Sequence, residues 1–81
     1  GARPLIRLSF IGDSAGEPVM STLIKKYGVD VNILLANLES IKDTPYGSLL
    51  IELQGDSEHI KNAMNFLEEK KLKVEVIGYV K

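Results

Sequence analysis

Cysteine and tryptophan are absent from the sequence, and histidine occurs once. Without cysteine, the chain can form neither disulfide bonds nor thiolate metal sites, and a single histidine gives little support for a zinc site. A charge of one sign is also lacking, because ten basic residues face eleven acidic ones and leave a net charge of −1. Such a chain exerts no overall attraction on nucleic-acid phosphates or anionic membranes. The longest unbroken apolar run, residues 33–36, is far shorter than the ~20 residues that span a bilayer.

The composition that remains is that of an ordinary globular domain. The 81 residues are 44% apolar and 26% charged, which fits one small folded domain and excludes disordered or collagen-like sequence. The chain opens with Gly1 and Ala2 instead of methionine. We therefore expect a piece of a longer protein, with residues 1–3 as a remnant or linker and residues 4–81 as the domain.

Four segments alternate between apolar and polar residues with the period of a β-strand. They cover residues 4–11, about 29–39, 48–54 and 72–80. Residues 42–47, which contain Pro45 and Gly47, are expected to form a turn or short loop between the middle two strands.

Two further segments have apolar residues at helical spacing. The first helix is expected to begin with a capping box of Ser14 and Glu17 and to end at Gly28. The second helix is expected to begin at Asp56 or Ser57 and to run to about residue 71. The element order is therefore β-α-β-β-α-β, and we expect an α+β fold of the ferredoxin-like type. In this fold a four-stranded antiparallel sheet carries both helices on one face, and the first and third strands are central.

Assigning the strongest apolar set of each strand to the helices leaves one face of the sheet uncovered, here called the open face. The residues expected on the open face are Leu5, Arg7, Ser9, Ile11, Asn32, Leu34, Ala36, Leu38, Ser48, Leu50, Glu52, Glu75, Ile77 and Tyr79. A sheet face that contacts only water should be mostly polar, but this one is mixed. Its most apolar part lies on the second strand, whose other side is apolar as well (Val29, Val31, Ile33 and Leu35).

An edge strand that is apolar on both sides is an aggregation hazard unless another element covers it. The hypothesis is that a second copy of the chain covers it, through the second strand and the open face, with Leu34 and Leu38 each contributing roughly 1.5–3 kcal/mol on burial. The alternative is that these leucines are ordinary isolated surface residues.

Asn32 is an unusual residue for such a strand, because asparagine is depleted in β-sheets. Its carboxamide offers two hydrogen-bond donors and an acceptor, so it could hold the charged end of a small zwitterion at the rim of an apolar pocket. Equally, Asn32 could face water or form a hydrogen bond across a dimer interface.

With this element order and Asn32-Ile33-Leu34 on the second strand, the chain resembles a NIL domain. That domain is named after this tripeptide and is found at the C-terminus of the ATP-binding subunits of methionine-import ABC transporters. The resemblance extends over nearly the whole chain. The matching stretches are residues 8–12, 17–18, 27–34, 45–47 and 74–80.

The resemblance implies an ACT-like regulatory domain that binds L-methionine at a homodimer interface and mediates feedback inhibition of uptake (transinhibition). It implies Asn32 as the main polar ligand contact, with Leu34 and Leu38 as the apolar wall and Tyr46-Gly47 either closing the pocket or forming a turn. The partners implied are the ATPase domain, which would hold ATP and Mg, and the membrane permease. The location implied is the cytoplasmic face of the cell membrane, reached through the transporter. No cofactor is expected in this part of the protein.

Other classes fit the residues less well. Acylphosphatases share the element order, but their phosphate loop needs an arginine, and residues 12–16 here contain an aspartate and no basic residue. The chain also lacks a phosphate-binding P-loop sequence, so we expect no enzyme activity. RNA-recognition modules stack bases on aromatic residues of the two central strands, and the residues expected on the open face of those strands here include no aromatic one. The remaining alternative is an ACT-type dimerisation module for another amino acid or without a ligand.

Overall fold

The computed structural model contains the six predicted elements in the predicted order. The strands are β1 (Arg3–Ile11), β2 (Asp30–Ile41), β3 (Thr44–Gln54) and β4 (Lys73–Val80), and the helices are α1 (Val19–Tyr27) and α2 (Ser57–Glu69). The structure describes residues 3–11, 19–70 and 72–80. The predicted capping box of Ser14 and Glu17 lies outside these residues.

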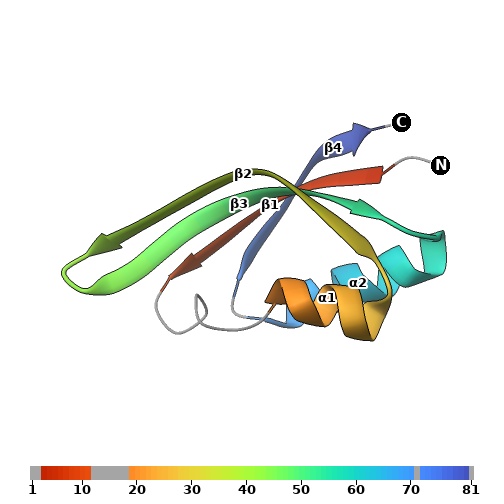
Figure 1. Cartoon of the computed structure of the whole chain (residues 1–81), viewed down its shortest axis with the longest axis horizontal. Coiled ribbons are helices and arrows are strands. Elements are labelled where there is room, and N and C mark those ends of the chain that lie inside the picture. The colour runs from red at the N-terminus through yellow and green to blue at the C-terminus, as the bar shows by residue number, and fades with distance from the viewer. Residues whose placement is uncertain (1–2, 12–18, 71, 81) are drawn as a thin grey trace.

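The four strands form one antiparallel sheet in the order β2-β3-β1-β4. The first and third strands are thus central and the second and fourth are the edges, which confirms the ferredoxin-like arrangement. Both helices lie on the same side of the sheet, next to each other (Figure 1). The other side is the open face.

The core lies between the helices and one half of the sheet. It is built from side chains that alternate along the central strands and recur at helical spacing, as the patterns require. Its buried members are Ile6, Leu8, Val19, Leu23, Val29, Ile51, Leu53, Ala63 and Leu67. At the margin of this core, the rings of Tyr27 and Phe66 join the two helices with centroids 5.0 Å apart.

Local signals set the ends of the helices. Gly28 follows α1 with φ +69°, a left-handed conformation that glycine adopts without steric cost. Asp56 precedes α2, and its carboxylate accepts a hydrogen bond of 2.9 Å from the backbone N–H of His59. The end of α1 and the start of α2 agree with the prediction, whereas α2 ends at Glu69, two residues before its predicted end.

The hairpin between β2 and β3 differs from the prediction. Only Lys42 and Asp43 form the turn, both with positive φ (50° and 68°), as in the two-residue turns whose twist matches the flanking strands. Thr44 pairs directly with Ile41, so the prediction of a turn over residues 42–47 is wrong for residues 44–47. The longer strands make a hairpin that extends beyond the helices (Figure 1) along the 42 Å axis of the molecule.

Each edge strand is interrupted by a bulge. On β2 the pairing passes from Ile33–Ile51 to Leu35–Leu50, so Leu34 is an extra residue. On β4 it passes from Gly78–Leu5 to Val76–Ile6, so Ile77 is an extra residue. An extra residue reverses the alternation of side chains beyond it.

Candidate functional site

The bulge at Leu34 redistributes the residues of β2 between the two faces of the sheet. Residues directly opposite in an antiparallel pair point to the same face. Asn32 stands opposite Glu52 on the open face, as predicted, but beyond the bulge Leu35 stands opposite Leu50 and joins the same face. Leu35 was expected on the helix side, so that assignment was wrong.

The face predicted for Leu38 was wrong for the same reason. Leu38 stands opposite Gly47, which in turn stands opposite Phe10, a residue on the helix side of β1. Ala36 moves with it, because it stands opposite Leu49. Asn32 and Leu38 therefore lie on opposite faces and cannot line one pocket within a single chain.

The bulge at Ile77 has the same effect on β4. Tyr79, expected on the open face, stands opposite Pro4 and lines a groove on the helix side together with Ile60 and Met64 of α2. The prediction for Tyr79 was therefore also wrong.

The surroundings of Asn32 are more polar than the sequence suggested. Its neighbour Glu52 is 7% exposed, although it lies on a face that no helix covers. The carboxylate of Glu52 accepts a 2.8 Å hydrogen bond from Gln54 Nε2 and lies 3.6 Å from Arg3 Nε. Leu5 stands opposite Glu52 on the other side. A carboxamide and a compensated carboxylate thus share one row of the open face.

Tyr46 and Gly47 lie far from Asn32, toward the hairpin end of β3. Tyr46 precedes Glu52 by six residues on β3, which is roughly 20 Å along a strand at about 3.3 Å per residue. Because they lie within β3, the alternative turn role for these two residues is wrong. Within one chain, the structure does not bring them to Asn32.

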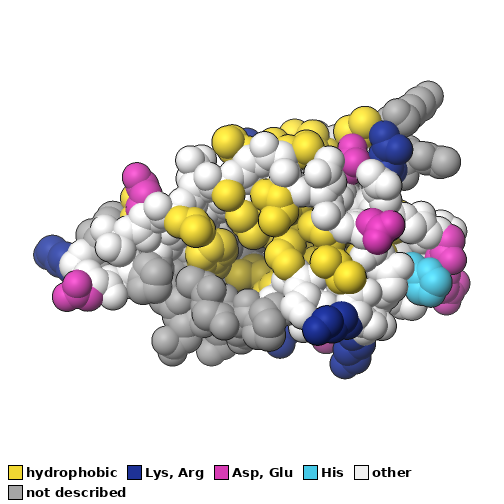
Figure 2. Space-filling view, viewed as in Figure 1, with side chains coloured by type: hydrophobic (Ala, Val, Ile, Leu, Met, Phe, Trp, Pro, Cys, Tyr) yellow, Lys and Arg dark blue, Asp and Glu magenta, His cyan; other side chains and the backbone are white. Residues whose placement is uncertain are grey.

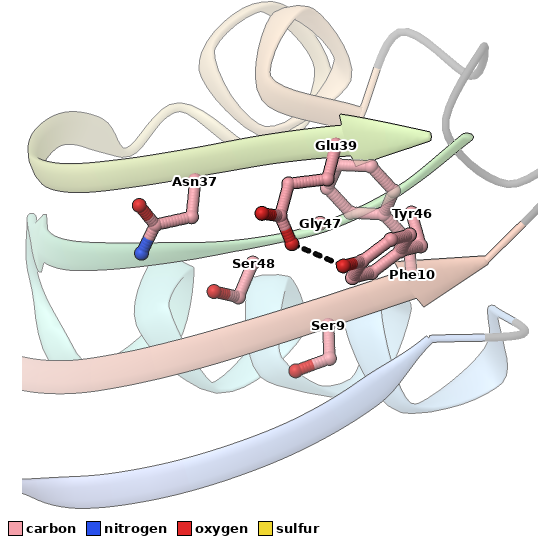
Figure 3. Close-up of a pocket in the computed structure, with 7 residues that line it drawn as sticks. All are labelled: Ser9, Phe10, Asn37, Glu39, Tyr46, Gly47 and Ser48. Carbon is pink, nitrogen blue, oxygen red and sulfur yellow. Dashed lines mark hydrogen bonds between the residues drawn. The ribbon is translucent and has the colours of Figure 1, made fainter. Parts of the chain in front are cut away.

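At the hairpin end of the open face lies a hollow of about 440 Å³ (Figure 3). Its lining comes from three strands and comprises Ser9, Phe10, Asn37, Glu39, Tyr46, Gly47 and Ser48. The phenol of Tyr46 donates a hydrogen bond to Glu39 Oε2. That hydrogen bond is the main cause that raises the pKa of Tyr46 above its ordinary value, and desolvation and the charge of Glu39 act in the same direction.

The edge strand β2 exposes apolar side chains on both faces, as predicted. Leu34, Leu35 and Leu38 are 49%, 56% and 70% exposed, and Ile33 is similar. Figure 2 shows hydrophobic side chains gathered in the middle of the molecule in this view, between the strands and the helices.

The described residues contain no group of three or more histidine and acidic side chains close enough to hold a metal ion. Neither helix that the structure describes is long and apolar enough to cross a membrane.

Sequence reasoning missed Glu52 beside Asn32 and five residues that line the hollow: Ser9, Phe10, Asn37, Glu39 and Ser48. Glu52 was assigned to the open face but not to a site, although counting from Asn32 along an antiparallel hairpin could have found it. Asn37 and Glu39 share the open face only because of the bulge, for which the run of apolar residues at 33–36 gives no signal.

Comparison with known proteins agrees with this architecture. The chain is 40% identical over 76 residues to the methionine import ATP-binding protein MetN of Bacillus subtilis, covering 94% of this chain and 22% of that protein. It is 36% identical over 80 residues to the protein of the same name from Vibrio cholerae, covering 99% of this chain and 23% of the relative. The chain thus spans about a fifth of the length of these curated relatives.

Among solved structures, the C-terminal domain of an ABC transporter ATP-binding protein from Enterococcus faecalis superposes with a TM-score of 0.76 at 31% identity, over 93% of this chain and 83% of that one. The model of the NIL domain family matches residues 4–76. Nearly the whole of the described sheet and both helices fall within that match, and the chain belongs to the NIL domain family.

Proposed function

We propose that this chain is the C-terminal regulatory domain of the ATP-binding subunit of a methionine ABC importer, and that it binds L-methionine. The observation that carries the proposal is the match over 94% of the chain to a methionine import ATP-binding protein. The position of Asn32 supports it, since its carboxamide lies on the open face beside exposed apolar side chains. Polar groups next to an apolar surface are what an amino acid with a thioether side chain requires.

The binding site that we propose has Asn32 as its main polar contact. Leu34 remains a candidate for the apolar wall. Leu35, which the register places two rungs from Asn32 on the same face with Leu50 opposite, takes the place of Leu38 in that wall.

The proposed dimer forms through β2 and the open face. A closed two-fold pair of identical edge strands runs antiparallel, so the hairpin end of one copy lies near the Asn32 end of the other. This geometry gives Tyr46 and Gly47 a way to contribute to the site, from the partner copy. Burying Leu34 and Leu35 would contribute roughly 1.5–3 kcal/mol each.

The proposed mechanism is thermodynamic linkage, and the chain itself performs no catalysis. A ligand shifts a conformational equilibrium only by its different affinities for the two states. Methionine held between two copies favours one spacing of the ATPase domains that precede them, and a coupling of about 1–3 kcal/mol is typical of such devices. Uptake through the permease would then slow when methionine accumulates at the cytoplasmic face of the membrane, where we place this domain.

The test is calorimetric titration of L-methionine into the wild type and into Asn32→Ala, with the fold checked by circular dichroism. We expect binding by the wild type, lost binding by the variant and the same spectrum for both. Unchanged affinity of the variant would remove Asn32 from the site.

Further titrations address the alternative functions. Tighter binding of leucine than of methionine would favour an ACT-type module for another amino acid. No heat with any amino acid would favour dimerisation without a ligand. Sedimentation tests the dimer separately, and a monomer at tens of micromolar chain would contradict it.

A further inference from the structure

A buried acid on an uncovered sheet face requires an explanation. Glu52 lies near the C-terminal end of the central strand β3, on the face that carries no helix, and is 7% exposed. Leu5 stands opposite it on β1, and Leu50 is the next residue on the same face of β3. Burying a carboxylate among leucines is costly unless cationic or hydrogen-bonding groups compensate it.

The two described polar contacts of the Glu52 carboxylate are both made to one of its oxygens, Oε1. Gln54 Nε2 donates to Oε1 at 2.8 Å, and Arg3 Nε lies 3.6 Å from the same oxygen. The Arg3 contact is longer than a hydrogen bond. Among the described contacts, Oε2 is therefore the oxygen left to accept hydrogen bonds from a further group.

The position of Asn32 indicates what that group is. Directly opposite side chains of an antiparallel pair have Cβ atoms about 4.5–5.5 Å apart, so the Asn32 carboxamide and the Glu52 carboxylate can contact the same small molecule. A carboxylate prefers a cation, and a carboxamide can donate to an anion. A free α-amino acid carries both charges, as an ammonium group and a carboxylate group bonded to the same α-carbon.

We propose that Glu52 is the second polar contact of the ligand that Asn32 binds, and that its Oε2 accepts hydrogen bonds from the α-ammonium group while Asn32 donates to the α-carboxylate. The side chain of the amino acid then lies against Leu35 and Leu50, which form the next opposite pair on the open face, two rungs from Asn32 and Glu52. This inference rests on the proposed function and adds a specificity: the site selects amino acids with a free α-amino group and rejects N-blocked ones.

The test varies the protein and the ligand together. L-methionine and N-acetyl-L-methionine are titrated by calorimetry into the wild type, Glu52→Gln and Glu68→Gln. Glutamine keeps the shape of Glu52 and removes its charge. Glu68 is the matched control, because it is exposed on α2, on the helix side of the sheet, and its substitution makes the same change in net charge away from the open face.

We expect Glu52→Gln to bind L-methionine about tenfold more weakly or worse, since a hydrogen bond between charged groups is lost, and Glu68→Gln to bind it like the wild type. We expect N-acetylation to weaken binding to the wild type by a similar factor and to make little further difference in Glu52→Gln. Equal binding of L-methionine by wild type and Glu52→Gln would overturn the role of Glu52 while leaving the proposed function intact.

A wild type that binds no methionine would refute the proposed function and this inference with it. If circular dichroism shows that Glu52→Gln does not fold, the comparison of the two ligands on the wild type decides. Equal affinity for methionine and its N-acetyl derivative would then overturn the inference.

Discussion

Replacing Gly47 with alanine tests the packing of the β2–β3 hairpin. A Cβ atom at Gly47 would lie 2.5 Å from the carbonyl oxygen of Asn37, 2.9 Å from Leu38 Cδ2 and 3.2 Å from Phe10 Cζ. The Leu38 and Phe10 side chains can move, but the Asn37 oxygen belongs to the backbone of the neighbouring strand. Glycine within a strand commonly marks such a close approach.

We expect Gly47→Ala to lower the free energy of unfolding by about 1–3 kcal/mol, the usual cost of overpacking. For a domain of this size, 2 kcal/mol corresponds to a fall in Tm of roughly 8–16 °C. Gly78→Ala is the matched control, because a Cβ there meets no atom within 4 Å. That variant should be as stable as the wild type or slightly more so, since alanine restricts the unfolded chain.

The assay is thermal and urea unfolding followed by circular dichroism, at one protein concentration because association would itself raise Tm. A Gly47→Ala variant with the stability of Gly78→Ala would show that the strands are not held as closely as the structure describes. A Gly78→Ala variant less stable than Gly47→Ala would contradict the described packing in the same way.

Three further predictions concern the strands and one helix cap. Deleting Leu34 should leave a folded protein, because it removes the extra residue and keeps every other β2 side chain on its face; the circular dichroism spectrum of an unfolded chain would contradict this. In a spectrophotometric titration Tyr46 should ionise at a higher pH than an ordinary tyrosine, and Glu39→Gln should lower that pH. The folded state holds the phenol proton of Tyr46 more tightly than the unfolded chain does. The stability that this proton contributes is therefore present below the ordinary tyrosine pKa and is lost as the pH rises through the raised pKa. An unchanged titration in Glu39→Gln would contradict this. Asp56→Ala should cost about 1 kcal/mol, because the cap of α2 is lost, and a urea midpoint equal to that of the wild type would exclude the capping role.

The order of elements, the sheet topology and the core could all be predicted from the sequence. Residues such as Ile6 and Leu8, or Ile51 and Leu53, alternate with polar neighbours along strands that have a helix on one side only, so the period of two was visible. The turn between β2 and β3 was misplaced because no glycine occupies the two positions with positive φ, Lys42 and Asp43, whereas Pro45 and Gly47 are typical turn formers that here lie inside a strand.

The site could be predicted only as far as the first bulge. Asn32 lies before it and was assigned to the correct face. Ile33, Leu34 and Leu35 are all apolar, so no change of pattern marks the extra residue, and the faces of Leu35 and Leu38 were exchanged. The burial of Glu52 depends on neighbours from other strands, which one-dimensional periodicity does not report.

The interruptions in the two edge strands also affect which chains can attach to this sheet. A long regular edge is a template for any extended segment, including the misfolded segments that start amyloid growth. At Leu34 and at Ile77 the pairing register of the edge strand shifts by one residue, so a straight foreign strand can pair with each edge for only part of its length. A strand with its own irregularity at the matching place could follow the whole edge, and the second copy of the chain in the proposed dimer would bring one.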